Sequence, residues 1–562
     1  MTASRNLLQT LTVTYCWLLL LAVSFAKYST PKSFYRSAYY KALNPGELTS
    51  DIYLQDHISL NSSFFYDVIA FFRLPLYDDF YGLLFFLAVS ALALWMTFLM
   101  VGEYFDINDP AISSVITLLL GFSFYKILIT VHGGAGTPHT IAQNALAHGL
   151  GIASLYFMAG RKAVPSALCI TLVLLIAPKG GFVLLPVALI YFLLRRPFKM
   201  SDALALSLPV MAIVGLSGRV AFPEEAEALI RICERVMERE DLEVAFHLQP
   251  VSALVLFVAS LAATPFLANR LRNPDFRRLY WCVSLVTLGL VVFGVYYLTL
   301  GYKIYPNPKL IMLSPVRAAK FQIFLFSMIV LVLVLQNDRF SWYEKTGVLT
   351  AFFLLRGDIT AIGYASFVLA ITFALSKWFS RMTESMLKPF SGIPVTVFVT
   401  IIVTVAFALQ LPRSYPVARM DMEMYRLTGQ WTRNSNIDLA DLNDFKLLAS
   451  MQDDFTLLGF YEDGEHFSPV LNAVDLMARK SSFIGEPATF YHRPKLWDEA
   501  VLRRQIAENL AESLNGGERV SWNIIAQLHE RRTRVMAPRK MALLFPASVT
   551  REVVGGYMLF KP

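Results

Sequence analysis

About thirteen stretches of mostly apolar residues follow one another up to residue 409, separated by short polar turns. A helix that crosses a bilayer needs about 20 apolar residues, and the shorter stretches would have to be tilted, broken or buried among neighbours. We predict helices over residues 7–26, 80–100, 111–129, 140–159, 163–177, 182–194, 203–216, 251–267, 281–300, 321–335, 346–355, 359–375 and 395–409. The pattern is typical of a polytopic α-helical membrane protein with about 13 transmembrane helices.

Residues 413–562 have a different character. They are polar throughout, with Asp, Glu and Arg spread along them and no spanning segment. Residues 497–514 follow a helical pattern, while 541–545 and 552–560 have the composition of strands, the second interrupted by a Gly-Gly pair. We therefore predict a transmembrane domain over residues 1–412 and a small soluble α/β domain over residues 413–562.

Two long loops, 27–79 and 217–250, each contain a predicted amphipathic helix of the kind that lies in the headgroup plane. The first has a capping serine at Ser62 or Ser63. Its apolar residues at helical spacing are Phe64, Phe65, Val68, Ile69 and Phe72. The apolar stripe of the second consists of Ala226, Leu229, Ile230, Cys233, Val236 and Met237. Simple loop packing is the alternative for both segments.

Composition and charge support the membrane assignment and give it an orientation. Of the residues, 56% are hydrophobic and 16% charged, too few charges for a soluble surface. With the N-terminus in the cytoplasm, the inner loops hold most of the basic turns, as the positive-inside rule requires. Those residues are Arg161, Lys162, Arg195, Arg196, Lys199, Arg270, Arg272, Arg277, Arg278, Arg339, Lys345, Lys377, Arg381 and Lys388. The two long loops and residues 413–562 then lie outside, and the net charge of +8 indicates no nucleic-acid partner.

Several basic residues are expected near the outer ends of spans, against that rule. They are Lys126, Lys179, Arg219, Lys303, Arg317, Lys320 and Arg356. Arg317 and Lys320 are three residues apart at the start of a predicted helix, so they share a face at an end that favours anions. We predict that they bind an anionic group at the outer membrane surface. Snorkelling of these side chains to lipid phosphates is the alternative.

The first outer loop also concentrates candidate chemistry, because Asp51, Asp56 and His57 lie within seven residues of one another. Asp51 follows Thr49-Ser50, so a helix N-cap is the structural alternative for this residue. The four cysteines show no paired spacing, which favours neither a disulfide framework nor a zinc site.

This layout resembles the GT-C superfamily, polytopic glycosyltransferases that use polyprenyl-phosphate-linked sugars. The matching features are the long acidic first outer loop with its amphipathic helix, a basic residue opening a late span (Arg317), and a soluble domain after the last span. The segment Gln430-Trp431-Thr432-Arg433-Asn434 resembles a Trp–Asn motif of some bacterial members. The resemblance implies a multi-pass enzyme of the bacterial inner membrane with a periplasmic C-terminal domain.

The resemblance also implies roles for residues. A first-loop carboxylate would act as the base, with Asp51 as first choice, Asp56 as second and the pair Asp78-Asp79 as third. Arg317 and Lys320 would hold the donor phosphate in an inverting displacement, and Lys303 or His57 would assist. A glycan or lipid would be the acceptor. A divalent metal could bridge Asp51 and Asp56, as in some members, but without a His/Asp cluster we predict no cofactor.

Three other functions are compatible with a polytopic chain. An O-antigen-type polymerase or ligase usually has its large outer loop late in the chain, whereas here the large outer elements are the first loop and residues 413–562. A transporter or flippase tends to show repeated halves, and this sequence shows no duplication. A non-catalytic envelope-assembly protein is the third.

Overall fold

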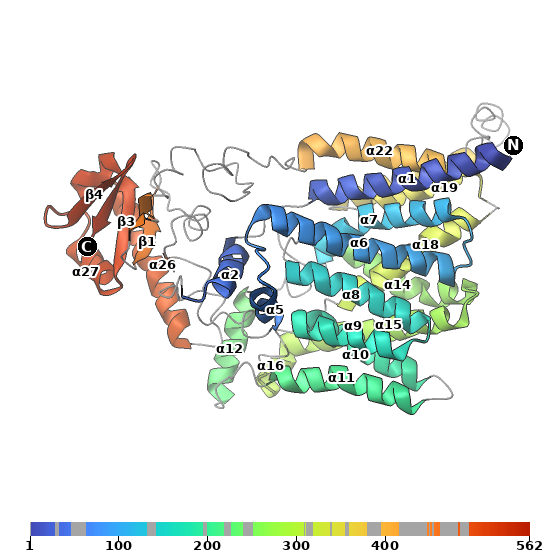
Figure 1. The fold of residues 1–562 in the computed structure, drawn as a ribbon, viewed down its shortest axis with the longest axis horizontal. Helices are drawn as coiled ribbons and strands as arrows, with labels where there is room; N and C mark the ends of the chain where they lie inside the picture. Colours follow the sequence, from blue (N-terminus) through green and yellow to red (C-terminus); the bar gives the residue numbers. More distant parts are fainter. Residues whose placement is uncertain are drawn as a thin grey trace.

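The computed structural model describes residues 2–27, 33–46, 63–131, 142–194, 199–217, 226–239, 251–307, 310, 318–337, 340–354, 359–378, 395–414, 447–448, 450–451, 455–460, 481–483 and 494–562. Most of these residues are helical, and a small sheet follows near the C-terminus, which confirms the predicted fold class. The two parts are well separated in Figure 1, with the helical bundle at one side and the sheet at the other.

Every predicted apolar segment forms a helix. These helices are α1 (Thr2–Lys27), α6 (Asp79–Tyr104), α7 (Pro110–Val131), α8 (Ala142–Ala159), α9 (Ala163–Ile176), α10 (Pro178–Leu193), α11 (Met200–Ser217), α14 (Val251–Arg270), α15 (Pro274–Tyr296), α18 (Ala319–Gln336), α19 (Trp342–Leu354), α20 (Ile359–Trp378) and α22 (Val395–Ser414). By length and composition, four helical stretches within the described residues can cross a membrane: Leu7–Phe25, Phe80–Tyr104, Pro274–Ile304 and Ala319–Gln336. The count of about 13 crossings stays a prediction.

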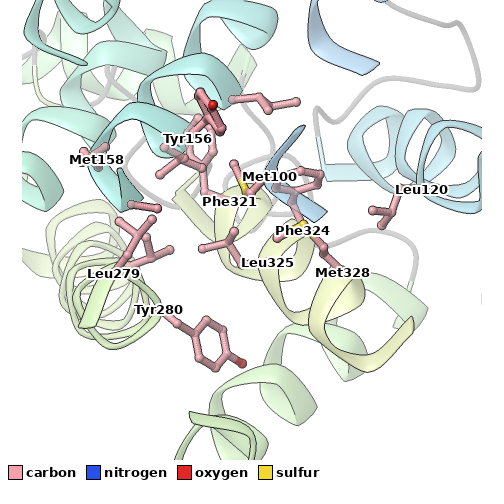
Figure 2. Packing of buried hydrophobic residues seen from close by; sticks show 14 of the residues in the cluster. Met100, Leu120, Tyr156, Met158, Leu279, Tyr280, Phe321, Phe324, Leu325 and Met328 are labelled. Carbon is pink, nitrogen blue, oxygen red and sulfur yellow. The ribbon is translucent and has the colours of Figure 1, made fainter. Parts of the chain in front are cut away.

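Helix α18 lies at the centre of the bundle. It packs against α7, α14 and α15, and nearly all of its residues are buried. Figure 2 shows its residues Phe321, Phe324, Leu325 and Met328 among side chains of the surrounding helices. An apolar helix surrounded by other helices needs no polar face, which explains why the sequence of α18 shows no amphipathic pattern.

The two ends of the bundle differ. The N-terminus lies at one end, and at the other lie the short helices α2 (Ser33–Leu43), α5 (Phe65–Phe72), α12 (Ala226–Arg239) and α16 (Tyr302–Ile304), beside the C-terminal sheet (Figure 1). We call this second end the outer end. The basic turn Arg161-Lys162 between α8 and α9 belongs to the N-terminal end, and the side of the membrane on which this end lies stays a prediction.

Helix α5 forms within the first predicted amphipathic segment and buries part of the predicted stripe. Phe65, Tyr66 and Ile69 are buried, whereas Phe71 and Phe72 are 81% and 63% exposed. Of the predicted stripe, Phe65 and Ile69 are therefore buried, while Val68 and Phe72 are exposed. Phe64 occupies the N-cap position, and Ser63 accepts a hydrogen bond from the backbone N–H of Phe65 at 3.0 Å.

Helix α12 is amphipathic as predicted, with Ile232 and Cys233 buried and Glu227 and Glu234 exposed. It contacts α16, which follows α15 through the π-helical turn η1 (Tyr297–Gly301). All four cysteines of the chain are buried and free.

The C-terminal sheet has the strand order β2-β1-β3-β5-β4. Its strands are β1 (Thr456–Gly459), β2 (Ser481–Ser482), β3 (Thr533–Pro538), β4 (Thr550–Val554) and β5 (Tyr557–Lys561). Strand β1 is parallel to β2 and β3, and β5 is antiparallel to β3 and β4. Helices α26 (Pro494–Asn515) and α27 (Trp522–Glu530) share one hydrophobic core with the sheet.

Two predictions for this part of the chain have opposite outcomes. The Gly-Gly interruption is the turn of a β4–β5 hairpin, where Gly555 has a φ of 56°, a conformation that glycine adopts without strain. The predicted strand at 541–545 is wrong, because Arg539–Leu544 forms the 3-10 helix η5. Five consecutive apolar residues are compatible with a strand or with a 3-10 helix, and packing of Met541 and Ala542 into the core decides between them.

Candidate functional site

Helix α18 begins deep inside the bundle. A Cβ added at Gly151 of α8 would lie 3.2 Å from Cε1 of Phe321, so the Phe321 ring packs directly against this glycine. Gly151 is nine residues into α8, which at 1.5 Å per residue is about 13 Å below the start of that helix. Lys320 directly precedes Phe321, so it lies beside a contact made inside α8 and not at the first turn of that helix. Its place at the outer membrane surface stays a prediction. Hydrophobicity predicts where a helix is, but neighbouring helices decide how deep it starts.

The turn between α9 and α10 lies at a similar level. Ile176 and Ala177 pack in one cluster with Leu146 and Leu150, which lie one to two turns into α8. The first outer loop rests on this turn, since Ser63 donates a hydrogen bond to the carbonyl of Ile176 at 2.5 Å. We call this level, marked by Ile176, His148 and Lys320, the floor of the outer end.

Helices α2 and α5 form a layer above the floor. Tyr39 of α2 packs edge to face on Phe65 of α5, with ring centroids 6.1 Å apart, and both side chains are buried against Ile176. The backbone N–H of Phe64 bonds the carbonyl of Leu175 at 2.8 Å. The loop layer is therefore attached to the helices by backbone and side-chain hydrogen bonds as well as by apolar contact.

Lys320 is the charged side chain at the floor. It is 7% exposed, and its Nζ lies 5.0 Å from the centroid of the Phe321 ring. The imidazole of His148 stacks on the same ring, with centroids 6.4 Å apart and planes at 17°, and it interacts electrostatically with Lys320. A buried ammonium in an apolar bundle is costly and usually marks a functional site. This arrangement suits the binding of an anion.

His148 was not among the predicted site residues, although the sequence held the signal that could have identified it. A histidine within a predicted span faces a cavity, a partner or a neighbouring helix, and His148 lies within the span predicted over residues 140–159. His148 and Gly151 are three residues apart, so they lie on the same face of α8, and both contact the Phe321 ring. This contact places His148 at the floor.

Most of the other predicted site residues fall outside the described chain. Asp51, Asp56, His57 and Arg317 are among them, so their roles stay predictions. The first three belong to the segment between Gly46, which follows α2, and Ser63. Ala318, which follows Arg317 directly, is fully buried.

Lys303 and Asp78 lie elsewhere in the outer end. Lys303 is exposed on α16, with its Nζ 5.9 Å from the Tyr302 ring, whereas Lys320 is buried. Asp78 is buried and caps α6 by accepting a hydrogen bond from the N–H of Phe80 at 2.8 Å. Within the described ranges no three His, Cys, Asp or Glu residues gather to hold a metal ion.

No protein-family model matches this chain, and no curated protein matches it. Among solved structures, ArnT from Cupriavidus metallidurans is similar in two states. The apo state is 12% identical with a TM-score of 0.46, over 100% of this chain and 98% of that one. The structure bound to undecaprenyl phosphate is 12% identical with a TM-score of 0.41, over 98% of this chain and 97% of that one. At this level of similarity no residue of that protein can be matched to a residue of this one.

Proposed function

We propose that the protein is a membrane-embedded glycosyltransferase that moves a sugar from a polyprenyl-phosphate donor to an extracytoplasmic glycan or lipid acceptor. One observation carries the proposal: the ammonium of Lys320 is buried at the start of α18, over the Phe321 ring, which packs on α8 beside His148. A lipid phosphate supplies the negative charge that such a group favours, and its apolar tail can remain beside the helices.

The proposed reaction is an inverting displacement. The acceptor hydroxyl attacks the anomeric carbon, the bond from that carbon to the phosphate oxygen breaks, and the phosphate leaves with the electron pair. Asp51 takes the hydroxyl proton, a step that typically contributes 10²–10⁴-fold. Arg317 and Lys320 stabilise the charge that grows on the phosphate, with Lys303 or His57 assisting. The proposal includes no metal ion.

Chain connectivity supports the meeting of these groups. The segment that holds Asp51 connects α2, which packs in the layer above the floor, to Ser63, which bonds the carbonyl of Ile176 at the floor. Lys320 reaches the same level from the centre of the bundle. We further propose a bacterial inner-membrane location, with the N-terminus in the cytoplasm and the C-terminal sheet in the periplasm.

The test is transfer of labelled sugar by the purified full-length protein, with a panel of undecaprenyl-phosphate sugars as donors. We expect Asp51→Asn to lose at least about 100-fold in kcat while it still binds undecaprenyl phosphate. Asp56→Asn is the matched variant from the same loop and should lose less. Wild-type transfer by Asp51→Asn would remove Asp51 from the role of base, and loss of transfer in EDTA would show that the reaction needs a divalent metal ion.

Lipid binding tests the substrate class independently of the acceptor. Native mass spectrometry should show that undecaprenyl phosphate binds more tightly than undecaprenol, which has the same tail without the charge. Equal binding of the two lipids by the wild-type protein would contradict a phosphate site.

A further inference from the structure

A buried polar network surrounds the start of α18. Ser284 of α15 donates to Oε1 of Gln322 at 2.8 Å. Nε2 of Gln322 donates to Oγ1 of Thr264 at 3.2 Å and to the carbonyl of Ser260 at 3.4 Å, both on α14. Tyr280 adds a hydrogen bond to the same carbonyl at 3.4 Å. Gln322 itself is fully buried, so one amide connects three helices inside the bundle.

The rest of α18 makes few directional contacts such as hydrogen bonds. Its buried residues between Gln322 and Gln336 are almost all apolar, and Oγ of Ser327 is buried with no hydrogen-bond partner among the described residues. Gln336 connects the far end of the helix to the carbonyl of Phe105 at 3.3 Å. Apolar contacts allow a helix to slide or rotate at modest cost, whereas interhelical hydrogen bonds specify its register. Gln322 is therefore suited to determine where the first turns of α18 lie.

Gln322 and Lys320 are two residues apart, so their side chains project about 200° apart around the helix. Gln322 faces α14 and α15, and Phe321 packs on α8 next to His148. A rotation that broke the amide contacts would also move the Lys320 ammonium away from its place over Phe321.

We propose that Gln322 is a positioning residue, which sets the depth and rotation of the first turn of α18 and thereby holds Lys320 at the floor for the donor phosphate. The inference rests on the proposed function for the identity of that anion. The inferred position of Lys320 does not depend on the proposed function. The positioning role of Gln322 and the proposed function can therefore be tested separately.

The variant Gln322→Leu removes the interhelical contacts with little change in side-chain volume. Its former partners find bonds within their own helices, since the Ser284 hydroxyl can turn to the carbonyl of Tyr280 at 2.9 Å and Thr264 donates to that of Ser260 at 2.9 Å. Few buried polar groups are thus left without a partner, and the variant should fold. Gln336→Leu is the matched control, because it replaces the same residue type at the other end of the same helix.

Alkylation of a cysteine at position 320 reports the position of the first turn without any ligand. Lys320→Cys is made in the otherwise wild-type protein and in the Gln322→Leu and Gln336→Leu variants. Iodoacetamide labelling of the peptide that contains position 320 is then followed by mass spectrometry. The native cysteines are all buried. Loss of interhelical hydrogen bonds should make local opening, and hence labelling, about 3- to 20-fold faster with Gln322→Leu. Gln336→Leu should leave the rate unchanged, and equal rates in all three backgrounds would overturn the inference.

Lipid binding then separates the two proposals, with Lys320 kept in place. Gln322→Leu should weaken binding of undecaprenyl phosphate about 3- to 20-fold and leave undecaprenol unaffected, and Gln322→Glu, which keeps an acceptor for Ser284, should restore part of it. If Lys320→Met weakens binding and Gln322→Leu does not, the positioning role is wrong and the proposed function stands. If labelling accelerates while neither variant alters lipid binding, Gln322 still positions α18 and the proposed phosphate site is wrong.

Discussion

Replacement of Lys320 by methionine should weaken lipid binding but should not lower the stability of the ligand-free protein. Methionine has a similar length and shape but no charge. The side chain of Lys320 is 7% exposed at the start of a buried helix, against Phe321. A residue kept for stability should lower the melting temperature when it is removed, whereas a residue kept for an anion should not.

The magnitudes follow from burial. Removing one partner of a buried, charge-assisted contact costs about 2–5 kcal/mol, so undecaprenyl phosphate should bind at least about 30-fold more weakly to Lys320→Met. Without ligand, the variant no longer buries an ammonium over the Phe321 ring, and replacement of buried charge by apolar groups is often neutral or stabilising. The melting temperature of the ligand-free protein should therefore stay the same or rise.

The assay compares lipid affinity by native mass spectrometry with thermal melting in the same detergent. Lys345→Met is the matched control, because Lys345 is also buried, at 9% exposure, and donates to the carbonyl of Leu335 at the other end of α18. This control should lose stability and keep lipid affinity. If Lys320→Met melts at a lower temperature and binds the phosphate lipid as tightly as wild type, Lys320 is a structural residue and the proposed site is wrong.

Two further predictions concern packing and pH. Gly151→Val should lower stability by about 1–3 kcal/mol, because even a Cβ at this position comes within 3.2 Å of Phe321; Gly289→Val, where nothing lies within 4 Å, should change melting far less. In the C-terminal domain, burial acts to raise the pKa of Glu499, but hydrogen bonds from Arg531 and Arg503 outweigh it and hold that pKa below its usual value. This carboxylate therefore adds stability above its unfolded pKa of about 4.3 and loses it as pH falls through the folded pKa. The difference in melting temperature between wild type and Glu499→Gln should be largest near neutral pH and vanish in acid; a constant difference would contradict the argument.

Long apolar segments were predictable because their signal is local. Each predicted span contains enough consecutive apolar residues to favour a helix on its own, and the structure has a helix at each of them. The β4–β5 hairpin was predictable for a similar reason, since the Gly555-Gly556 pair demands a turn. Short helices and strands were harder to predict from the sequence. Helix α2 and strand β3 were missed, because a few residues of mixed polarity satisfy several structures.

The candidate site shows the same division. The sequence marked Lys320 as a basic residue at the start of an apolar helix, a setting that is unusual wherever the helix lies. It could not show that Lys303 is exposed while Lys320 is buried, or that His148 stacks on Phe321. Those relations join α8, α16 and α18, which are far apart along the chain.

The amino-acid sequence by itself determined which segments are helical and apolar, and where polar chain begins, because burial of apolar side chains and backbone hydrogen bonding act within a segment. The tertiary structure alone decided how deep α18 begins, which face of α5 is buried, and which side chains meet Lys320. The physical reason is that an apolar helix surface is compatible with many depths and rotations. Contacts such as Phe321 on Gly151 and Gln322 with Ser284, made between distant segments, select one of them.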